Sequence, residues 1–228
     1  MNMFVEALGW MADPSNWQGN SGILHRIVEH LLLCASLVAA ALAVAVPVGL
    51  FVGHTGRYSS AVTSVAGGAR AIPTLGLLTI LGLAFGIGIK APWIALFVLA
   101  VPSVLAGAYS GVQNIERVTT EAARSMGYSE WQIVARVELP LALPVIVGAV
   151  RTATLQVIAT ATLAAYIADV GLGRLLYVGL KTRDYPQMLA ASLLVVALSL
   201  IIDAVLWIVQ KYTVSLAQPV ASETSIQA

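Results

Sequence analysis

Few residues in this sequence have the types and spacing that catalysis, metal binding or nucleotide binding requires. His25, His30 and His54 have no cysteine or carboxylate partners at ligand spacing, and Cys34 is the only cysteine. The sequence has no Gly-x4-Gly-Lys-Ser/Thr phosphate loop and no His-Glu or Ser-His set at a sensible spacing. It therefore predicts no catalytic, cofactor-binding or metal-binding residues and no internal disulfide.

The charges that call for an explanation lie inside apolar segments. An unpaired charge deep in a bilayer costs on the order of 3 kcal/mol, so pairing or a wet cavity is expected. We expect Asp203 to pair with Arg151 or Arg70 near an inner gate, with snorkelling to the interface as the alternative. Thr154 and Pro73 are further candidates for a transport path. Helix packing and a structural kink are the respective alternatives for these two.

The elements that position these residues are apolar helices. The chain has 228 residues, of which 59% are hydrophobic and 10% charged, whereas a soluble domain is typically about 25% charged. Apolar runs of about 20 residues predict an all-α integral membrane protein. We expect five spans, with the second kinked or broken at Pro73, so the termini should lie on opposite sides. Their expected ranges are 28–52, 61–87, 93–112, 139–167 and 187–209.

The remaining segments define the expected organisation. Residues 1–22 have no basic n-region, which argues against a cleaved signal peptide and favours a periplasmic or interfacial segment, either a short surface helix or a frayed tail. Residues 23–212 form the transmembrane domain, and 213–228 form a polar tail expected to be disordered. The connection 169–186 is extramembrane or re-entrant. Basic residues divide five against five between the two sides, so they do not orient the chain, and the net charge of +1 gives no argument for nucleic-acid binding.

A polar insert, residues 113–138, interrupts the apolar pattern. Its sequence predicts two short helices joined by a sharp turn: Gly127 suits a left-handed C-cap, and Ser129 with Gln132 matches a capping box. The second helix is expected over about 130–138, before Leu139-Pro140 begins the next span. Trp131 lies on this second helix. Covering the bundle's own end and docking a partner are both consistent with this pattern.

The insert resembles the EAA loop of ABC-importer permeases. Glu121-Ala122-Ala123, Gly127, Val137 and Leu139-Pro140 match E-A-A-x3-G-x9-I-x-L-P, with Val137 in the isoleucine position. The stretches RAIPTLGLL (70–78), VELPLALPVIVGAVRTATL (137–155), TATLAA (160–165) and GLG (171–173) resemble permeases of osmoprotectant importers. Methionine-importer permeases share the five-helix architecture and are the nearest alternative. Ala168-Asp169-Val170 stands where many members of the family have Gly-Ala-Gly.

The resemblance implies a five-transmembrane-helix ABC type I importer permease core with a cytoplasmic coupling helix, in the bacterial cytoplasmic (inner) membrane. The implied substrate is a compatible solute such as glycine betaine, carnitine, choline or proline betaine. A separate ATPase subunit would bind ATP and Mg, a second permease copy or paralogue would complete the pore, and an extracytoplasmic solute-binding protein would dock on 169–186. The residues implied in ATPase coupling are Glu121, Ala122, Ala123, Gly127, Ser129, Trp131, Val137, Leu139 and Pro140.

Two other classes of function remain as rivals. A membrane-embedded enzyme would need a polar catalytic set, which the sequence does not supply. A self-gated channel would leave the polar insert without a partner.

Overall fold

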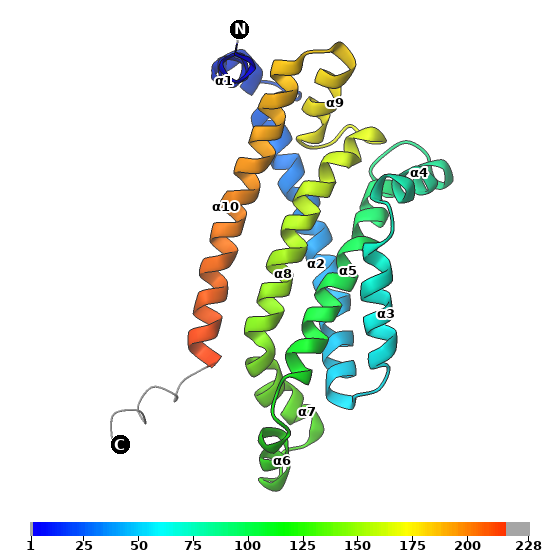
Figure 1. Ribbon diagram of the computed structural model, residues 1–228, viewed down its shortest axis with the longest axis vertical. Coiled ribbons are helices and arrows are strands. Elements are labelled where there is room, and N and C mark those ends of the chain that lie inside the picture. The colour runs from blue at the N-terminus through cyan, green and yellow to red at the C-terminus, as the bar shows by residue number, and fades with distance from the viewer. Residues whose placement is uncertain (1, 218–228) are drawn as a thin grey trace.

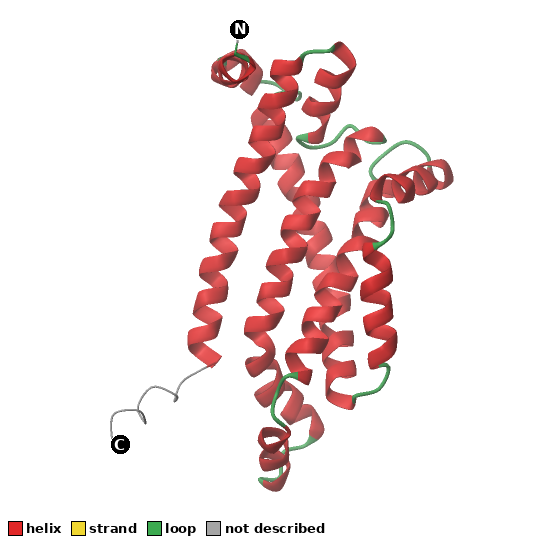
Figure 2. Ribbon diagram, viewed as in Figure 1, coloured by secondary structure: helices red, strands yellow, loops and turns green. Residues whose placement is uncertain are grey.

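The computed structural model describes residues 2–217, without the side chains of residues 70 and 215–217, and every regular element in this range is a helix (Figure 2). The all-α prediction is therefore confirmed. The elements are α1 (Met3–Ala12), η1 (Pro14–Trp17), α2 (Ile23–Thr55), α3 (Ser59–Arg70), α4 (Thr74–Phe85), α5 (Lys90–Gln113), α6 (Arg117–Ser125), α7 (Glu130–Ile133), η2 (Val134–Glu138), α8 (Leu139–Ala161), η3 (Thr162–Tyr166), α9 (Gly173–Thr182) and α10 (Tyr185–Ala217).

Four helices in the described range are long and apolar enough to cross a membrane: α2, α5, the helix that contains α8, and α10. The second predicted span is instead a pair, α3 and α4, bent by 90°. Pro73 lies in the extended conformation between them, because it has no N–H to continue α3 and instead precedes the first turn of α4. The break at Pro73 was predicted. The right angle, which lays α4 across one end of the bundle, was not (Figure 1).

Small residues bring the central helices α2, α5 and α8 together. Gly49 of α2 lies against Ala108 of α5, and Gly107 of α5 lies against Ala149 of α8. Apolar burial gives little driving force between helices in lipid, so close backbone approach and dispersion contacts take its place. α10 packs on the outside of α8.

The two ends of the bundle carry different elements (Figure 1). One end holds α1, α4 and α9, and the other holds α6 and α7 together with the last described turns of α10. The described ends of the chain thus lie on opposite sides, as predicted. α1 is a helix with Ala7 buried and Phe4 and Leu8 exposed. α10 continues to Ala217, so residues 213–217 are helical rather than part of the expected tail, and residues 218–228 lie outside the described range.

A methyl group added at Gly107 should destabilise the bundle, because its Cβ would overlap the Cβ of Ala149. Overpacking of this kind costs about 1–3 kcal/mol. We expect Gly107→Ala to lower the thermal unfolding temperature of the purified protein in detergent. Gly9→Ala is the matched control, since no atom lies within 4 Å of the added Cβ. Equal unfolding temperatures for the two variants would contradict the packing described here.

Candidate functional site

The polar insert projects beyond one end of the bundle as an elbow (Figure 1). Its first arm, α6, ends at Gly127, whose φ of +87° is readily adopted only by glycine. The Gly127 N–H donates to the Arg124 carbonyl at 2.9 Å, and the Tyr128 N–H donates to the Ala123 carbonyl at 3.2 Å. This is a Schellman motif, in which the backbone turn satisfies the last carbonyls of the helix. The predicted left-handed cap is confirmed.

The second arm, α7 and η2, begins with the predicted capping box. The Ser129 hydroxyl accepts from the Gln132 N–H at 3.4 Å, and the Ser129 N–H donates to the Gln132 side-chain oxygen at 2.8 Å. These reciprocal bonds start the helix at a fixed position.

The second arm ends at Glu138 and α8 begins at Leu139, as predicted. The sequence did not predict that the arm and the fourth span form one helix from Glu130 to Tyr166. Residues 134–138 form a π-helical turn, in which the Leu139 N–H donates to the Val134 carbonyl. Proline lacks the N–H of a regular turn, and the wider π turn lies directly before Pro140. The second arm and the span are therefore continuous.

The insert exposes three large apolar side chains. Val118, Met126 and Trp131 are 72%, 72% and 76% exposed. Sequence reasoning selected Trp131 but missed Val118 and Met126, because a lone apolar residue on a short polar helix gives no periodic signal. Large apolar side chains this exposed at the end of a bundle are typical of a binding surface.

The other predicted coupling residues divide between this surface and the interior. Glu121 and Ala122 are exposed, whereas Ala123 is 2% exposed and packs against its own chain. Val137 and Leu139 are partly buried. Pro140 is exposed on the first turn of α8.

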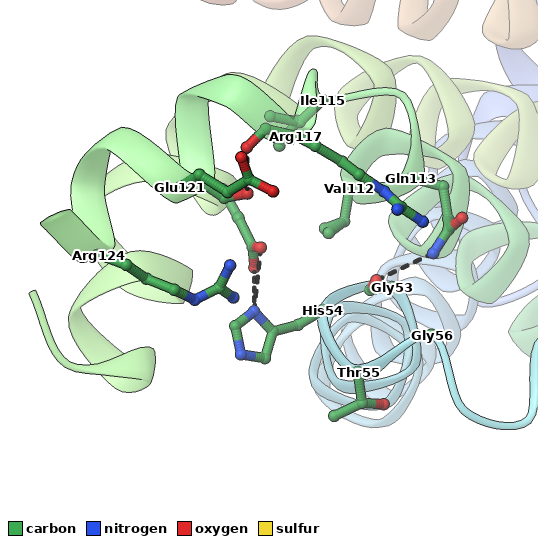
Figure 3. A pocket seen from close by; sticks show the side chains of 12 residues that line it. Gly53, His54, Thr55, Gly56, Val112, Gln113, Ile115, Arg117, Glu121 and Arg124 are labelled. Carbon is green, nitrogen blue, oxygen red and sulfur yellow. Dashed lines mark hydrogen bonds and ion pairs between the residues drawn. The ribbon is translucent and has the colours of Figure 1, made fainter.

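A polar pocket of about 340 Å3 separates the first arm from the ends of α2 and α5 (Figure 3). Arg117, Glu121 and Arg124 line it from α6. At the opposite wall the Gln113 side chain donates to the Gly53 carbonyl at 3.0 Å, which joins α5 to α2.

His54 connects the C-terminal end of α2 to the second arm. Its Nδ1 lies 2.9 Å and 3.0 Å from the two carboxylate oxygens of Glu138, and its Nε2 lies 3.2 Å from Glu130. Glu138 is 4% exposed. Sequence reasoning gave His54 no carboxylate partner, because its partners lie at remote positions in the chain.

A bidentate ion pair holds the two arms together. Arg124 donates from Nε and Nη2 to the two carboxylate oxygens of Glu130, at 2.9 Å and 3.0 Å. These hydrogen bonds raise the pKa of Arg124 further above its ordinary value, so the guanidinium stays charged. Both side chains are about half exposed, so the pair joins the two arms but contributes little to the stability of the fold.

Inside the bundle, Arg151 of α8 and Asp203 of α10 form a bidentate pair with distances of 2.6 Å and 2.8 Å. Arg151 also donates to Gln210 at 3.4 Å. Of the two predicted partners for Asp203, the structure brings Arg151 to it, and the side chain of Arg70 lies outside the description.

The other path candidates make local contacts. The Thr154 hydroxyl donates to the Val150 carbonyl of its own helix at 2.8 Å, and Thr152 and Thr160 bond in the same way. Thr154 also lines an apolar groove between α2, α8 and α10. Pro73 is exposed at the joint of α3 and α4. A gating role for either residue stays a prediction.

The end of the bundle opposite the insert has its own charge network. The buried Arg26 of α2 donates to Glu29 and to Asp169, each at 2.8 Å. Arg174 lies 3.2 Å from Asp169. Asp169 belongs to the tripeptide that departs from the family pattern, and here it ties the loop before α9 to α2.

Comparisons with known proteins agree on one family. A family model described as "binding-protein-dependent transport system inner membrane component" matches residues 45–214. The chain is 30% identical to the glycine betaine/carnitine/choline transport system permease protein OpuCB of Bacillus subtilis (strain 168), over 85% of this chain and 90% of that protein. It is also 30% identical to the osmoprotectant import permease protein OsmW of Salmonella typhimurium, over 86% of this chain and 93% of that protein.

Among solved structures, the chain resembles a subunit in inward-facing conformations of the MetNI methionine ABC transporter. The TM-score is 0.73 and the sequences are 22% identical, over 84% of this chain and 95% of that one. At this identity the likeness shows the fold alone.

Exchanging the charges of Arg151 and Asp203 tests whether their pairing holds α8 and α10 together. Arg151→Asp places two carboxylates face to face, and Asp203→Arg places two guanidinium groups face to face, so each single variant should give severalfold less folded protein. The double variant should recover most of the yield, measured by size-exclusion chromatography in detergent. The matched control is the same exchange at Arg124 and Glu130, an exposed bidentate pair whose loss costs less. A double variant no better than the single variants would contradict the pairing.

Proposed function

Because the chain belongs to the family of binding-protein-dependent transport system inner membrane components, we propose that it is the membrane-spanning subunit of an ABC importer for a compatible solute such as glycine betaine, carnitine, choline or proline betaine. The observation that carries the substrate class is the likeness to the permease of Bacillus subtilis, which extends over 85% of this chain. That likeness spans the transmembrane helices as well as the polar insert.

In this proposal the chain hydrolyses nothing itself, and a separate ATPase subunit binds ATP and Mg. A second permease copy or a paralogue completes the pore, and an extracytoplasmic solute-binding protein docks at the end of the bundle that carries 169–186. The polar insert faces the cytoplasm of a bacterial cell and the chain crosses the inner membrane several times. The geometry supports this arrangement because the insert and the 169–186 connection lie at opposite ends of the bundle (Figure 1).

The exposed patch of Val118, Met126 and Trp131 is the proposed contact surface for the ATPase. Aromatic and apolar side chains at the centre of an interface usually contribute most of its binding energy. The continuous helix from Glu130 to Tyr166 supports the coupling, since movement of Trp131 by a closing ATPase dimer would move α8 with it.

Truncating the patch should release the ATPase. A central aromatic residue commonly contributes about 2 kcal/mol or more, which corresponds to a loss of roughly 30-fold in affinity. We expect Trp131→Ala, and more strongly Trp131→Ala with Met126→Ala, to lose the ATPase subunit when the complex is purified from co-expressing cells. Trp207→Ala, at a tryptophan 50% exposed on α10, is the matched control. Undiminished recovery of the ATPase with the double variant would rule out this surface.

The substrate class is tested by solute-stimulated ATP hydrolysis in the complex reconstituted with its ATPase and binding protein. Glycine betaine, carnitine or choline should raise the rate, and methionine at the same concentration should not. A complex without the binding protein provides the background rate. Stimulation by methionine alone would replace the proposed substrate with that of the alternative, an amino-acid importer of the methionine type.

A further inference from the structure

We propose that His54 is a positioning residue that fastens the inner end of α2 to the second arm of the polar insert, so that movement of the insert reaches α2 directly. This inference rests on the proposed function, because it adds a route by which the partner ATPase would drive the bundle. The chain itself links the insert only to α5 before it and α8 after it. α2 has no such covalent connection and depends on side chains.

The contacts of His54 involve both sides of its ring. Nδ1 faces Glu138 at 2.9 Å, and Nε2 faces Glu130 at 3.2 Å. The imidazole is 13% exposed and the Glu138 side chain is 5% exposed, so this part of the link is shielded from water. Glu130 is the first residue of the second arm, and Glu138 is the last residue of its π turn. A single imidazole ring therefore contacts residues at both ends of that arm.

The chemistry of these partners explains why one ring can link them. An ionised carboxylate only accepts hydrogen bonds, and an imidazole nitrogen donates one when it carries a proton. The neutral ring therefore donates to one of the two carboxylates, and the protonated ring donates to both. In either form His54 joins α2 to the second arm.

The charges around the ring form a short chain of pairs. Glu130 is shared between His54 on one side and Arg124 of the first arm on the other. The titratable and charged groups that face His54 from the neighbouring elements, or line the adjacent pocket, are Glu130, Glu138, Arg124, Glu121 and Arg117. Of these, Glu138 and Glu130 contact the ring. Figure 3 shows Arg117, Glu121 and Arg124 around this pocket.

A second hydrogen bond, at the same end of α2, connects this helix to α5. Gln113, the last residue of α5, donates to the carbonyl of Gly53, which adjoins His54. The inner end of α2 is thus bonded to the helix that enters the insert and to the arm that leaves it. Of the two bonds, only the one through His54 depends on a titratable group.

The first test measures hydrogen exchange of the backbone amides of residues 129–138 in the purified chain. His54→Ala should make these amides exchange severalfold faster, because the second arm loses its connection to α2. The matched control is His25→Ala, at the outer end of the same helix, where the ring lies 3.2 Å from Glu29. Unchanged exchange in His54→Ala would overturn the inference.

The second test measures solute transported per ATP hydrolysed in the reconstituted complex. His54→Gln has a single amide donor group and cannot reproduce both contacts of the imidazole, so its ratio should fall severalfold below the wild-type ratio. His25→Gln, at the other end of the same helix, is the matched control and should keep the wild-type ratio. An unchanged ratio in His54→Gln would also overturn the inference.

The two tests separate this inference from the proposed function. A wild-type complex that shows no solute-stimulated hydrolysis counts against the proposed function. The exchange measurement needs no partner, and by itself it decides whether His54 holds the insert.

Discussion

The continuity of the helix from Glu130 to Tyr166 is the constraint on which the rest of the structure depends. A helix that ends at a membrane surface leaves carbonyls and N–H groups to be satisfied by caps or water, and a second helix start repeats that cost. This chain makes one start, at the Ser129 capping box, and then passes Pro140 through a π turn. The exposed Trp131 and the intramembrane Arg151 therefore belong to one helical element. Because Arg151 binds Asp203, α10 is attached to the same element.

Polar and charged side chains connect segments at both ends and in the middle of the bundle. Arg26 binds Asp169 at the end that carries α9, Arg151 binds Asp203 between α8 and α10, and His54 binds Glu138 at the end that carries the polar insert. Each of these pairs joins segments far apart in the chain. Small residues such as those at the α5–α8 contact allow close approach but do not by themselves select one relative position of the helices. Pairs with fixed geometry supply that selection, because a buried polar or charged group that loses its partner is costly.

Much of this arrangement was predictable from the sequence, and the unpredicted parts share a physical cause. Hydropathy located the spans, local capping rules located the joint at Gly127 and the start at Ser129, and the cost of a lone charge predicted a partner for Asp203. The 90° bend at Pro73 was not predicted, because proline determines where a helix breaks but tertiary packing determines the angle. The π turn before Pro140 and the contact between His54 and Glu138 were missed for a related reason. The first depends on how the backbone relaxes around a proline, and the second joins residues that only the folded bundle brings together.

The two arms of the insert are held in different ways, and this difference bears on how force would pass through them. The second arm is covalently part of the α8 helix and carries the buried contact between Glu138 and His54. The first arm is separated from α2 and α5 by a polar pocket and is held to the second arm by the exposed Arg124–Glu130 pair. Exposed ion pairs rearrange at low cost, whereas a continuous helix with a buried charge pair does not. Under the proposed function, a partner that moves the insert would therefore displace α8 and α2 together, and the exposed Arg124–Glu130 pair is the contact that could rearrange.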